Sequence, residues 1–161
     1  MPSPSPSCGP QTRVAFVQSS WHESLIERCR SSFMDELSVL GIAESQVDVF
    51  RVPGAFEIPL LAKRAMRSGC YDAVVAAALV IDGGIYRHEF VAESVLDALM
   101  RAQMESDVPL ISAVLTPHHF HEHATHVEFF GEHLSQKGAE AARACIGALA
   151  ALEELAAAVA A

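Results

Sequence analysis

Basic residues are scarce in this sequence. It holds 11 Lys and Arg against 20 Asp and Glu, which gives a formal net charge of −9. A surface of this charge repels phosphate backbones, and no concentrated basic stripe is visible, so we expect no nucleic-acid partner. Long apolar runs are missing too. The stretch ALAALEELAAAVAA is interrupted by Glu153 and Glu154, and no run approaches the roughly twenty residues of a membrane helix, so we expect no membrane partner.

Cysteine is equally sparse, with four residues far apart in the chain and no Cys-x-x-Cys motif. This spacing is typical of reduced thiols in a cytoplasmic protein and argues against a disulfide scaffold. The first ten residues, MPSPSPSCGP, have neither the basic nor the apolar region of a secretory signal. We therefore expect a cytoplasmic protein in which residues 1–12 form a flexible tail and residues 13–161 form a single domain.

Four β-prone runs alternate with helical patterns along the chain. Strands are expected at residues 13–18, 46–52, 71–81 and 108–116, and helices at about 22–40, 57–67, 89–105 and 138–161. One more helix is expected before the segment 129–137, which separates it from the last one. The third and fourth runs are almost continuously apolar, which predicts buried strands. The alternation predicts an α/β fold, a three-layer α/β/α sandwich with a four-stranded parallel sheet.

The unusual segments of the chain all follow predicted strands. They are SSWH, VPGAFE, VIDGGIYRHEF and LTPHHFHEH, in chain order. In an open parallel sheet, ligands bind outside the carboxyl ends of the strands. The four segments are therefore expected at one edge of the sheet, where they can build one pocket.

Several side chains in these segments suit a ligand. Trp21 can stack on a planar ring, although a tryptophan in the core or in an interface would also fit the pattern. Glu57 can accept hydrogen bonds from hydroxyl or imide groups, or it can be an ordinary acid at a helix start. Two glycines before a helix leave backbone N–H groups for a phosphate. Arg87 and His88 follow them, a permanent cation beside a group that exchanges protons near neutral pH.

The segment TPHHFHEHATH raises the question of a metal site. The zinc-protease pattern His-Glu-x-x-His places two imidazoles on one helix face. Here the partner of His121 comes one residue late, at His126, which is turned about 140° away on a helix. His119 and His123 have the spacing of one helical turn, but no carboxylate or cysteine supports them. We therefore expect no metal; His118, His119, His121 and His123 stay unassigned.

Four motifs resemble one known family, the 6,7-dimethyl-8-ribityllumazine synthases. They are VPGAFEIP, AALVIDGGIYRHEFV, VPLISAVLT and QKGAEAA, and the resemblance covers nearly the whole chain after the tail. It implies a flavodoxin-like fold and a transferase of riboflavin biosynthesis. The implied reaction condenses 5-amino-6-(D-ribitylamino)uracil with 3,4-dihydroxy-2-butanone 4-phosphate, without a cofactor, to give 6,7-dimethyl-8-ribityllumazine.

The resemblance also implies roles for single residues. Trp21 takes the place of an aromatic side chain that stacks on the pyrimidine ring. Ala55, Phe56 and Glu57 are implied to bind the ribityl chain. Leu79, Val80 and Ile81 are implied to present backbone groups to the pyrimidine. Gly84 and Ile85 are implied to bind the phosphate of the second substrate. Ser112 falls where a neighbouring subunit completes the pyrimidine site.

The chain departs from the common family pattern at three positions. Asp82 replaces an arginine, and His126 replaces a phosphate-binding arginine. The acid/base histidine of the family aligns with Arg87, and His88 comes one place later. Because an arginine is a poor proton shuttle, we expect His88 to carry the proton transfers and Arg87 to supply charge.

These departures resemble a second type of lumazine synthase, whose members form decamers of two pentamers. The hydrophobic share of 51% also suggests apolar surface buried between subunits. We expect a homodecamer, and the length of the segment 129–137 favours it. Two alternatives stay open: a protein that binds flavins or lumazines with little or no turnover, and a metal-dependent protein.

Overall fold

The structure is a computed structural model of the chain. It describes residues 11–82, 84, 87–117 and 124–160, without the side chains of Ala124 and His126. The elements in chain order are β1 (Val14–Ser19), α1 (Glu23–Val39), η1 (Glu44–Gln46), β2 (Val47–Val52), η2 (Ala55–Glu57), α2 (Ile58–Arg67), β3 (Ala73–Leu79), α3 (His88–Ser106), β4 (Leu110–Leu115) and α4 (Ala124–Ala160). The alternation of strands and helices is confirmed, and the short 3-10 helices η1 and η2 were not predicted.

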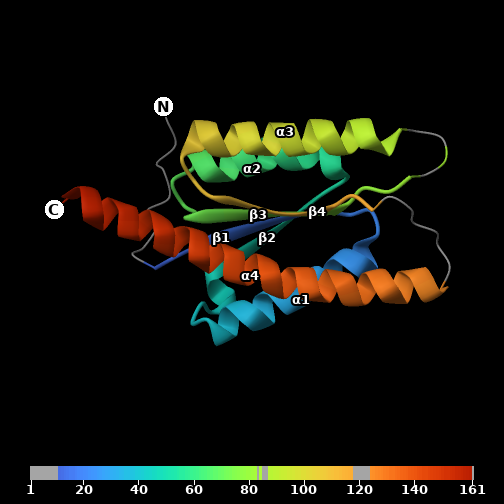
Figure 1. The fold of residues 1–161 in the computed structure, drawn as a ribbon, viewed down its shortest axis with the longest axis horizontal. Coiled ribbons are helices and arrows are strands. Elements are labelled where there is room, and N and C mark those ends of the chain that lie inside the picture. The colour runs from blue at the N-terminus through green and yellow to red at the C-terminus, as the bar shows by residue number, and fades with distance from the viewer. Residues whose placement is uncertain (1–10, 83, 85–86, 118–123, 161) are drawn as a thin grey trace, which may run out of the picture.

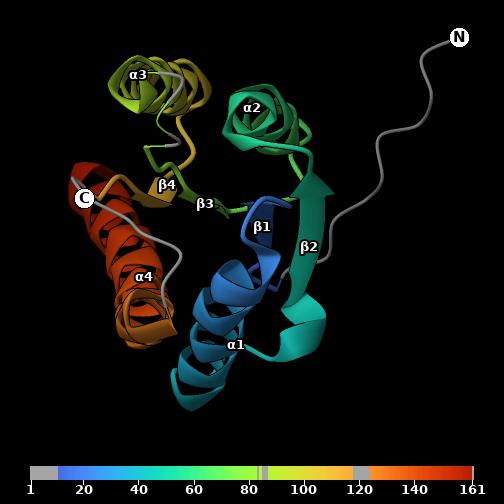
Figure 2. The same ribbon diagram turned by 90° about the vertical axis from the view of Figure 1, so that its right-hand side faces the viewer.

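The four strands form one parallel sheet in the order β2-β1-β3-β4. Helices α2 and α3 cover one face of the sheet, and α1 and α4 cover the other (Figures 1 and 2). The three-layer α/β/α sandwich with a four-stranded parallel sheet is therefore confirmed. Within the described residues, no helix is both long enough and apolar enough to cross a bilayer.

Each face of the sheet has its own apolar core because side chains along a strand alternate. On β1, Phe16 points to α1 and α4 and meets Phe33 with ring centroids 5.1 Å apart. The next residue, Val17, points to α2 and α3. All seven residues of β3 are buried, as expected for a strand covered on both faces.

Strand β4 differs from its prediction. It lies at an edge of the sheet, where Ala113 is its one buried residue and Ser112 is exposed. The prediction of a buried strand is therefore wrong for the single chain. An apolar run shows that a strand avoids water, but it does not distinguish a central strand from an edge strand that another subunit can cover.

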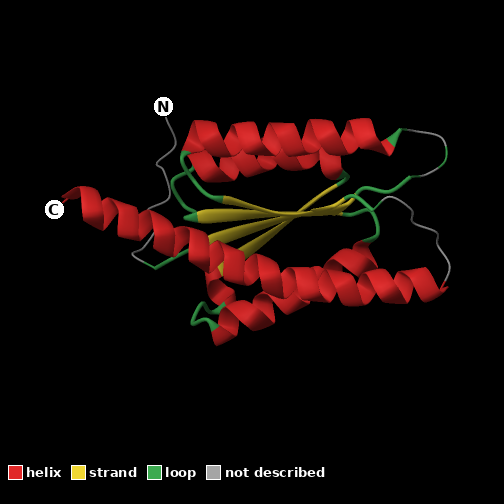
Figure 3. Cartoon of the chain, in the orientation of Figure 1, coloured by secondary structure: helices red, strands yellow, loops and turns green. Residues whose placement is uncertain are grey.

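Helix α4 also differs from its prediction. Residues 124–160 form one continuous helix, so the expected separate segment at 129–137 is wrong (Figure 3). Leu134 in this segment is fully buried. The Ser135 hydroxyl donates a hydrogen bond to the Gly131 carbonyl, one helical turn earlier. Gly138 lies inside this helix, and the reason for a glycine at this position is packing. A Cβ there would overlap the carbonyl oxygen of Cys29 on α1, so the glycine lets two helix backbones touch.

The last turns of α4 extend past the body of the domain. Residues 151–160 are all exposed, and they include the apolar side chains of Leu152, Leu155 and Val159. Figure 1 shows this part of the helix projecting beyond the sheet. The helix therefore has a longer part packed in the core on this face and a shorter outer end, residues 151–160, that is exposed.

Candidate functional site

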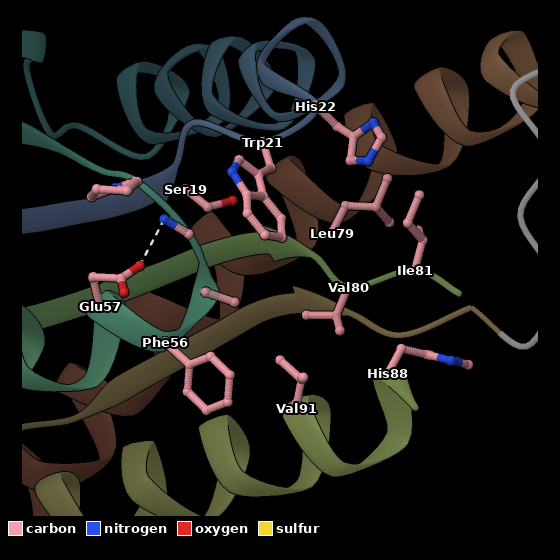
Figure 4. Close-up of a pocket in the computed structure, with 13 residues that line it drawn as sticks. Ser19, Trp21, His22, Phe56, Glu57, Leu79, Val80, Ile81, His88 and Val91 are labelled. Atoms are coloured by element: carbon pink, nitrogen blue, oxygen red, sulfur yellow. Dashed lines mark hydrogen bonds between the residues drawn. The ribbon is translucent and has the colours of Figure 1, made fainter. Parts of the chain in front are cut away.

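A cavity of about 550 Å³ opens at the edge of the sheet where the strands have their carboxyl ends. Its lining residues come from the segments after β1, β2 and β3 and from the start of α3 (Figure 4). They are Ser19, Trp21, His22, Pro53, Gly54, Ala55, Phe56, Glu57, Leu79, Val80, Ile81, His88 and Val91. Three of the four segments expected at this edge therefore line one pocket; in the fourth, LTPHHFHEH, residues 118–123 lie outside the described residues and residues 115–117 do not line the cavity.

The segment after β1 carries an exposed indole into the cavity. The Ser20 N–H and hydroxyl both donate to the Val52 carbonyl, at 2.8 and 3.0 Å, which ties the ends of β1 and β2 together. Trp21 follows and is 70% exposed, so it is not a core tryptophan within this chain. His22 then adopts φ 55° and ψ 40°, a left-handed conformation that is uncommon outside glycine. This turn directs α1 away and leaves the indole over the cavity.

The segment after β2 holds a carboxylate beside this indole. Gly54 N–H donates to Glu57 Oε2 at 2.8 Å, across the 3-10 turn η2. A Cβ on Gly54 would lie 3.2 Å from that oxygen and 3.9 Å from Trp21 Cε2. The glycine thus allows the carboxylate and the indole to approach the same stretch of backbone. Helix α2 begins directly afterwards with Pro59 in its first turn, where a missing N–H costs little.

The start of α3 separates the two candidate catalytic residues. His88 is its first residue, lines the cavity, and has a side chain only 12% exposed. Arg87 is exposed, and its guanidinium lies over the Phe90 ring at 4.9 Å from the centroid. Arg87 is not among the cavity residues. Of the two neighbours, His88 is the residue that lines the cavity.

The remaining predicted site residues fall into three groups. Gly84 is described but outside the cavity lining, and its N–H donates to Asp82 Oδ1 at 2.8 Å instead of remaining open for an anion. Ser112 lies on the exposed edge strand β4, also away from the cavity. Ile85 and the side chain of His126 lie outside the described residues. The same is true of the four unassigned histidines, at positions 118, 119, 121 and 123.

An ion-pair network under the first loop holds α1 in place. Glu27 on α1 accepts hydrogen bonds from Arg30 on the same helix, from Gln18 at the end of β1, and from Arg51 on β2. Burial by itself raises the pKa of Glu27, but the hydrogen bonds from these partners outweigh it, so its pKa is lowered. The charged carboxylate therefore joins one helix to two strands.

Five cavity residues are not among those predicted for the site: Ser19, His22, Pro53, Gly54 and Val91. Ser19 and His22 lie within two residues of Trp21, Pro53 and Gly54 directly precede Ala55, and Val91 lies one helical turn after His88. In the part of the chain that the structure describes, no group of three or more His, Cys, Asp or Glu side chains is arranged to hold a metal ion.

Comparisons with known proteins agree with this geometry. The family model described as 6,7-dimethyl-8-ribityllumazine synthase matches residues 11–153. A protein of that name from Rhodococcus erythropolis is 55% identical over 143 residues, covering 89% of this chain and 92% of its own. A "6,7-dimethyl-8-ribityllumazine synthase 2" from Pseudomonas syringae pv. tomato is 54% identical over 140 residues, covering 87% and 82%.

A solved structure shows a similar fold at low sequence similarity. It is a "split gene transketolase, inactive beta4 tetramer", with a TM-score of 0.51 and 17% identity, covering 84% of this chain and 40% of that one. At this identity the similarity concerns the fold alone. The family match and the two relatives extend over almost the whole described domain, and the chain belongs to the 6,7-dimethyl-8-ribityllumazine synthase family.

Proposed function

We propose that this chain catalyses the condensation of 5-amino-6-(D-ribitylamino)uracil with 3,4-dihydroxy-2-butanone 4-phosphate to give 6,7-dimethyl-8-ribityllumazine. The observation that carries the proposal is one cavity, in a chain of this family, that brings together an exposed indole, a carboxylate and an imidazole. An indole suits a pyrimidine ring, a carboxylate suits a polyol, and an imidazole suits proton transfer.

The amine substrate takes the part of the cavity nearest β1 and β2. Trp21 stacks on its ring, and Glu57 accepts hydrogen bonds from its ribityl hydroxyls. The backbone around these groups completes the contacts, through Ala55, Phe56, Leu79, Val80 and Ile81. Support comes from the position of these residues in one cavity, and from the Gly54 N–H that fixes one oxygen of the carboxylate.

The reaction itself requires positioning and proton movement. Imine formation, loss of phosphate and ring closure each move protons, and His88 is the titratable group of α3 that lines the cavity. Holding both substrates together supplies several kcal/mol of the barrier reduction. Acid/base help from His88 adds about 10²- to 10⁴-fold. Arg87 contributes positive charge from outside the cavity.

For the phosphate end of the second substrate we propose Gly84, Ile85 and His126, with the Gly84 N–H leaving Asp82 Oδ1 when the phosphate binds. Only the imidazolium form of His126 mimics the arginine of the common pattern. We expect His126→Ala to weaken use of the phosphorylated ketone more at pH 6 than at pH 8. Equal losses at both values, measured as KM for that substrate, would argue against the role.

The sites are completed between subunits of a homo-oligomer built on pentamers, and we propose a decamer. Support comes from α3, which exposes Phe90, Met100 and Met104 at 56%, 57% and 72%, and from the open edge of β4 with Ser112. Apolar side chains this exposed favour a contact surface. The segment 129–137 no longer supports the decamer, because it is helical. Native mass spectrometry distinguishes ten copies of the 17.3 kDa chain from five or sixty.

A cytoplasmic location completes the proposal. Cys29 and Cys145 are buried free thiols, as in proteins of a reducing compartment.

One assay tests the function against both alternatives. The purified protein is incubated with the two substrates, with and without a chelator, and lumazine formation is followed by fluorescence. We expect formation above the uncatalysed rate that the chelator does not change. Tight riboflavin binding without formation would indicate a binding protein. Loss of rate with the chelator, together with stoichiometric bound metal, would indicate a metal-dependent protein.

A further inference from the structure

One polar group in the cavity has no partner among the described residues. The hydroxyl oxygen of Ser19, the last residue of β1, is buried and makes no hydrogen bond there, and the whole residue is only 1% exposed. A buried hydroxyl without a partner opposes folding, and such groups are rare in native proteins. Its neighbour Ser20 shows the usual outcome, with its hydroxyl on the Val52 carbonyl at 3.0 Å.

The direction of the Ser19 side chain suggests what it meets. Side chains alternate along β1, so Ser19 points to the same face of the sheet as Val17, the face with the cavity. In the view of Figure 4, Ser19 is drawn between the Trp21 indole and Glu57, whose carboxylate accepts from the Gly54 N–H. Ser19 therefore lines the same cavity as both groups proposed to hold the amine substrate, and its hydroxyl is covered in the ligand-free chain, so the side chain must turn to reach a ligand.

The chemistry of the two neighbouring polar groups is complementary. The two oxygens of the Glu57 side chain are hydrogen-bond acceptors, and one of them already accepts from the Gly54 N–H. A serine hydroxyl both donates and accepts. Consecutive hydroxyls of a polyol also donate and accept, so a polyol beside Glu57 needs a second partner that can donate to it.

We propose that Ser19 is a substrate-binding residue whose hydroxyl hydrogen-bonds a hydroxyl of the ribityl chain. The assignment rests on the proposed function, since it takes the ribityl compound as the ligand. It accounts for a buried hydroxyl that no atom of the described chain satisfies. The bond that it lacks in the ligand-free chain is made when the polyol binds.

Two variants separate ligand binding from the effect of removing a buried hydroxyl. Ser19→Ala removes the proposed partner. Ser106→Ala is the matched control: the Ser106 hydroxyl, at the end of α3, is also buried and unpartnered within the described residues, but it is not part of the cavity. The full-length oligomer is used for both. The probes are 6,7-dimethyl-8-ribityllumazine and 6,7,8-trimethyllumazine, which has a methyl group in place of the ribityl chain.

Both variants are expected to unfold at the same temperature as the ligand-free parent protein, or at a higher one. Ser19→Ala is expected to bind the ribityl compound about tenfold more weakly, and the trimethyl compound with unchanged affinity. Ser106→Ala is expected to bind both as the parent does. Dissociation constants are measured by fluorescence titration, and the KM for the ribitylamino substrate should rise by a similar factor.

Two results would overturn the assignment. One is binding of the ribityl compound by Ser19→Ala within twofold of the parent. The other is an equal loss for both compounds, which would indicate a packing role for Ser19. Turnover assays on the same variants distinguish a failure of the Ser19 assignment from a failure of the proposed function. If the parent forms no lumazine but shows the same Ser19 dependence in binding, the enzyme assignment fails and the Ser19 assignment stands.

Discussion

Replacing Gly138 by alanine tests the close contact between α1 and α4. A Cβ at this position would overlap the Cys29 carbonyl oxygen and lie 3.0 Å from the backbone nitrogen of Phe33. A side chain can rotate away from such an overlap, but a helix backbone cannot. The two helices must therefore separate, which loosens the packing around Phe33 and Leu134 in the core on this face.

The size of the effect follows from two opposing contributions. Overpacking in a core costs about 3 kcal/mol at the upper end of its usual range. Alanine in place of glycine inside a helix returns about 1 kcal/mol. The net loss of about 2 kcal/mol in the free energy of unfolding lowers the melting temperature by about 4–8 °C for a chain of this length.

Two other glycines of the same helix provide matched controls. A Cβ at Gly147 meets no described atom within 4 Å, so Gly147→Ala should raise the melting temperature by about 2–4 °C. A Cβ at Gly131 meets the end of the flexible Arg28 side chain, which can move, so Gly131→Ala should change little. Thermal unfolding of all three variants is followed at one protein concentration. If Gly138→Ala melts with the parent or above it, the backbone contact does not exist as described.

Other predictions concern the site and the thiols. Trp21→Ala should weaken binding of the ribityl substrate at least tenfold while Trp21→Phe keeps most of it, measured as KM; equal effects would contradict stacking. His88→Ala should lower kcat by about 10²- to 10⁴-fold and remove a step from the pH–rate profile, whereas Arg87→Ala should keep that step; the reverse result would move the proton transfer to Arg87. Burial raises the pKa of the Cys29 thiol to about 12 and that of Cys145 to about 11, so iodoacetamide at pH 8.5 should label neither until the protein is unfolded, as checked by mass spectrometry. Because both pKa values exceed the usual 9.0, their contribution to stability is complete below about pH 9 and is lost as the pH rises through 11 and 12.

The sequence predicted most of the fold because its apolar runs and turn residues agree with one another. The strands and the first three helices lie within about two residues of their expected bounds, since each is bounded by polar or glycine-containing segments. The two errors concern tertiary contacts. Nothing in the run VPLISAVLT says that β4 is at an edge. Nothing local to Gly138 indicates that another helix backbone lies against it, so the sequence alone predicts a helix start there.

In the candidate site, too, the positions of residues were predictable from the sequence, whereas their tertiary contacts were not. Trp21, Glu57 and His88 were predicted because each follows a strand, and the carboxyl ends of parallel strands meet at one edge. The side-chain directions were beyond a sequence argument. Arg87 and His88 are neighbours in the chain, yet one stacks on Phe90 outside and the other faces inward. For Ser19 the sequence did contain an indication. It lies two residues after Val17 on β1, and because side chains alternate along a strand, both point to the face of the sheet that carries the cavity.

The packed part of α4 and its exposed end differ in what keeps them helical. Around Leu134 and Cys145 the helix is held by a buried layer, so its amide hydrogens should exchange with solvent only when that layer opens. Residues 151–160 are wholly exposed and have only alanine propensity and their own backbone bonds to support them. One uninterrupted helix therefore has two local stabilities, and its outer turns can unwind and re-form many times without disturbing the domain.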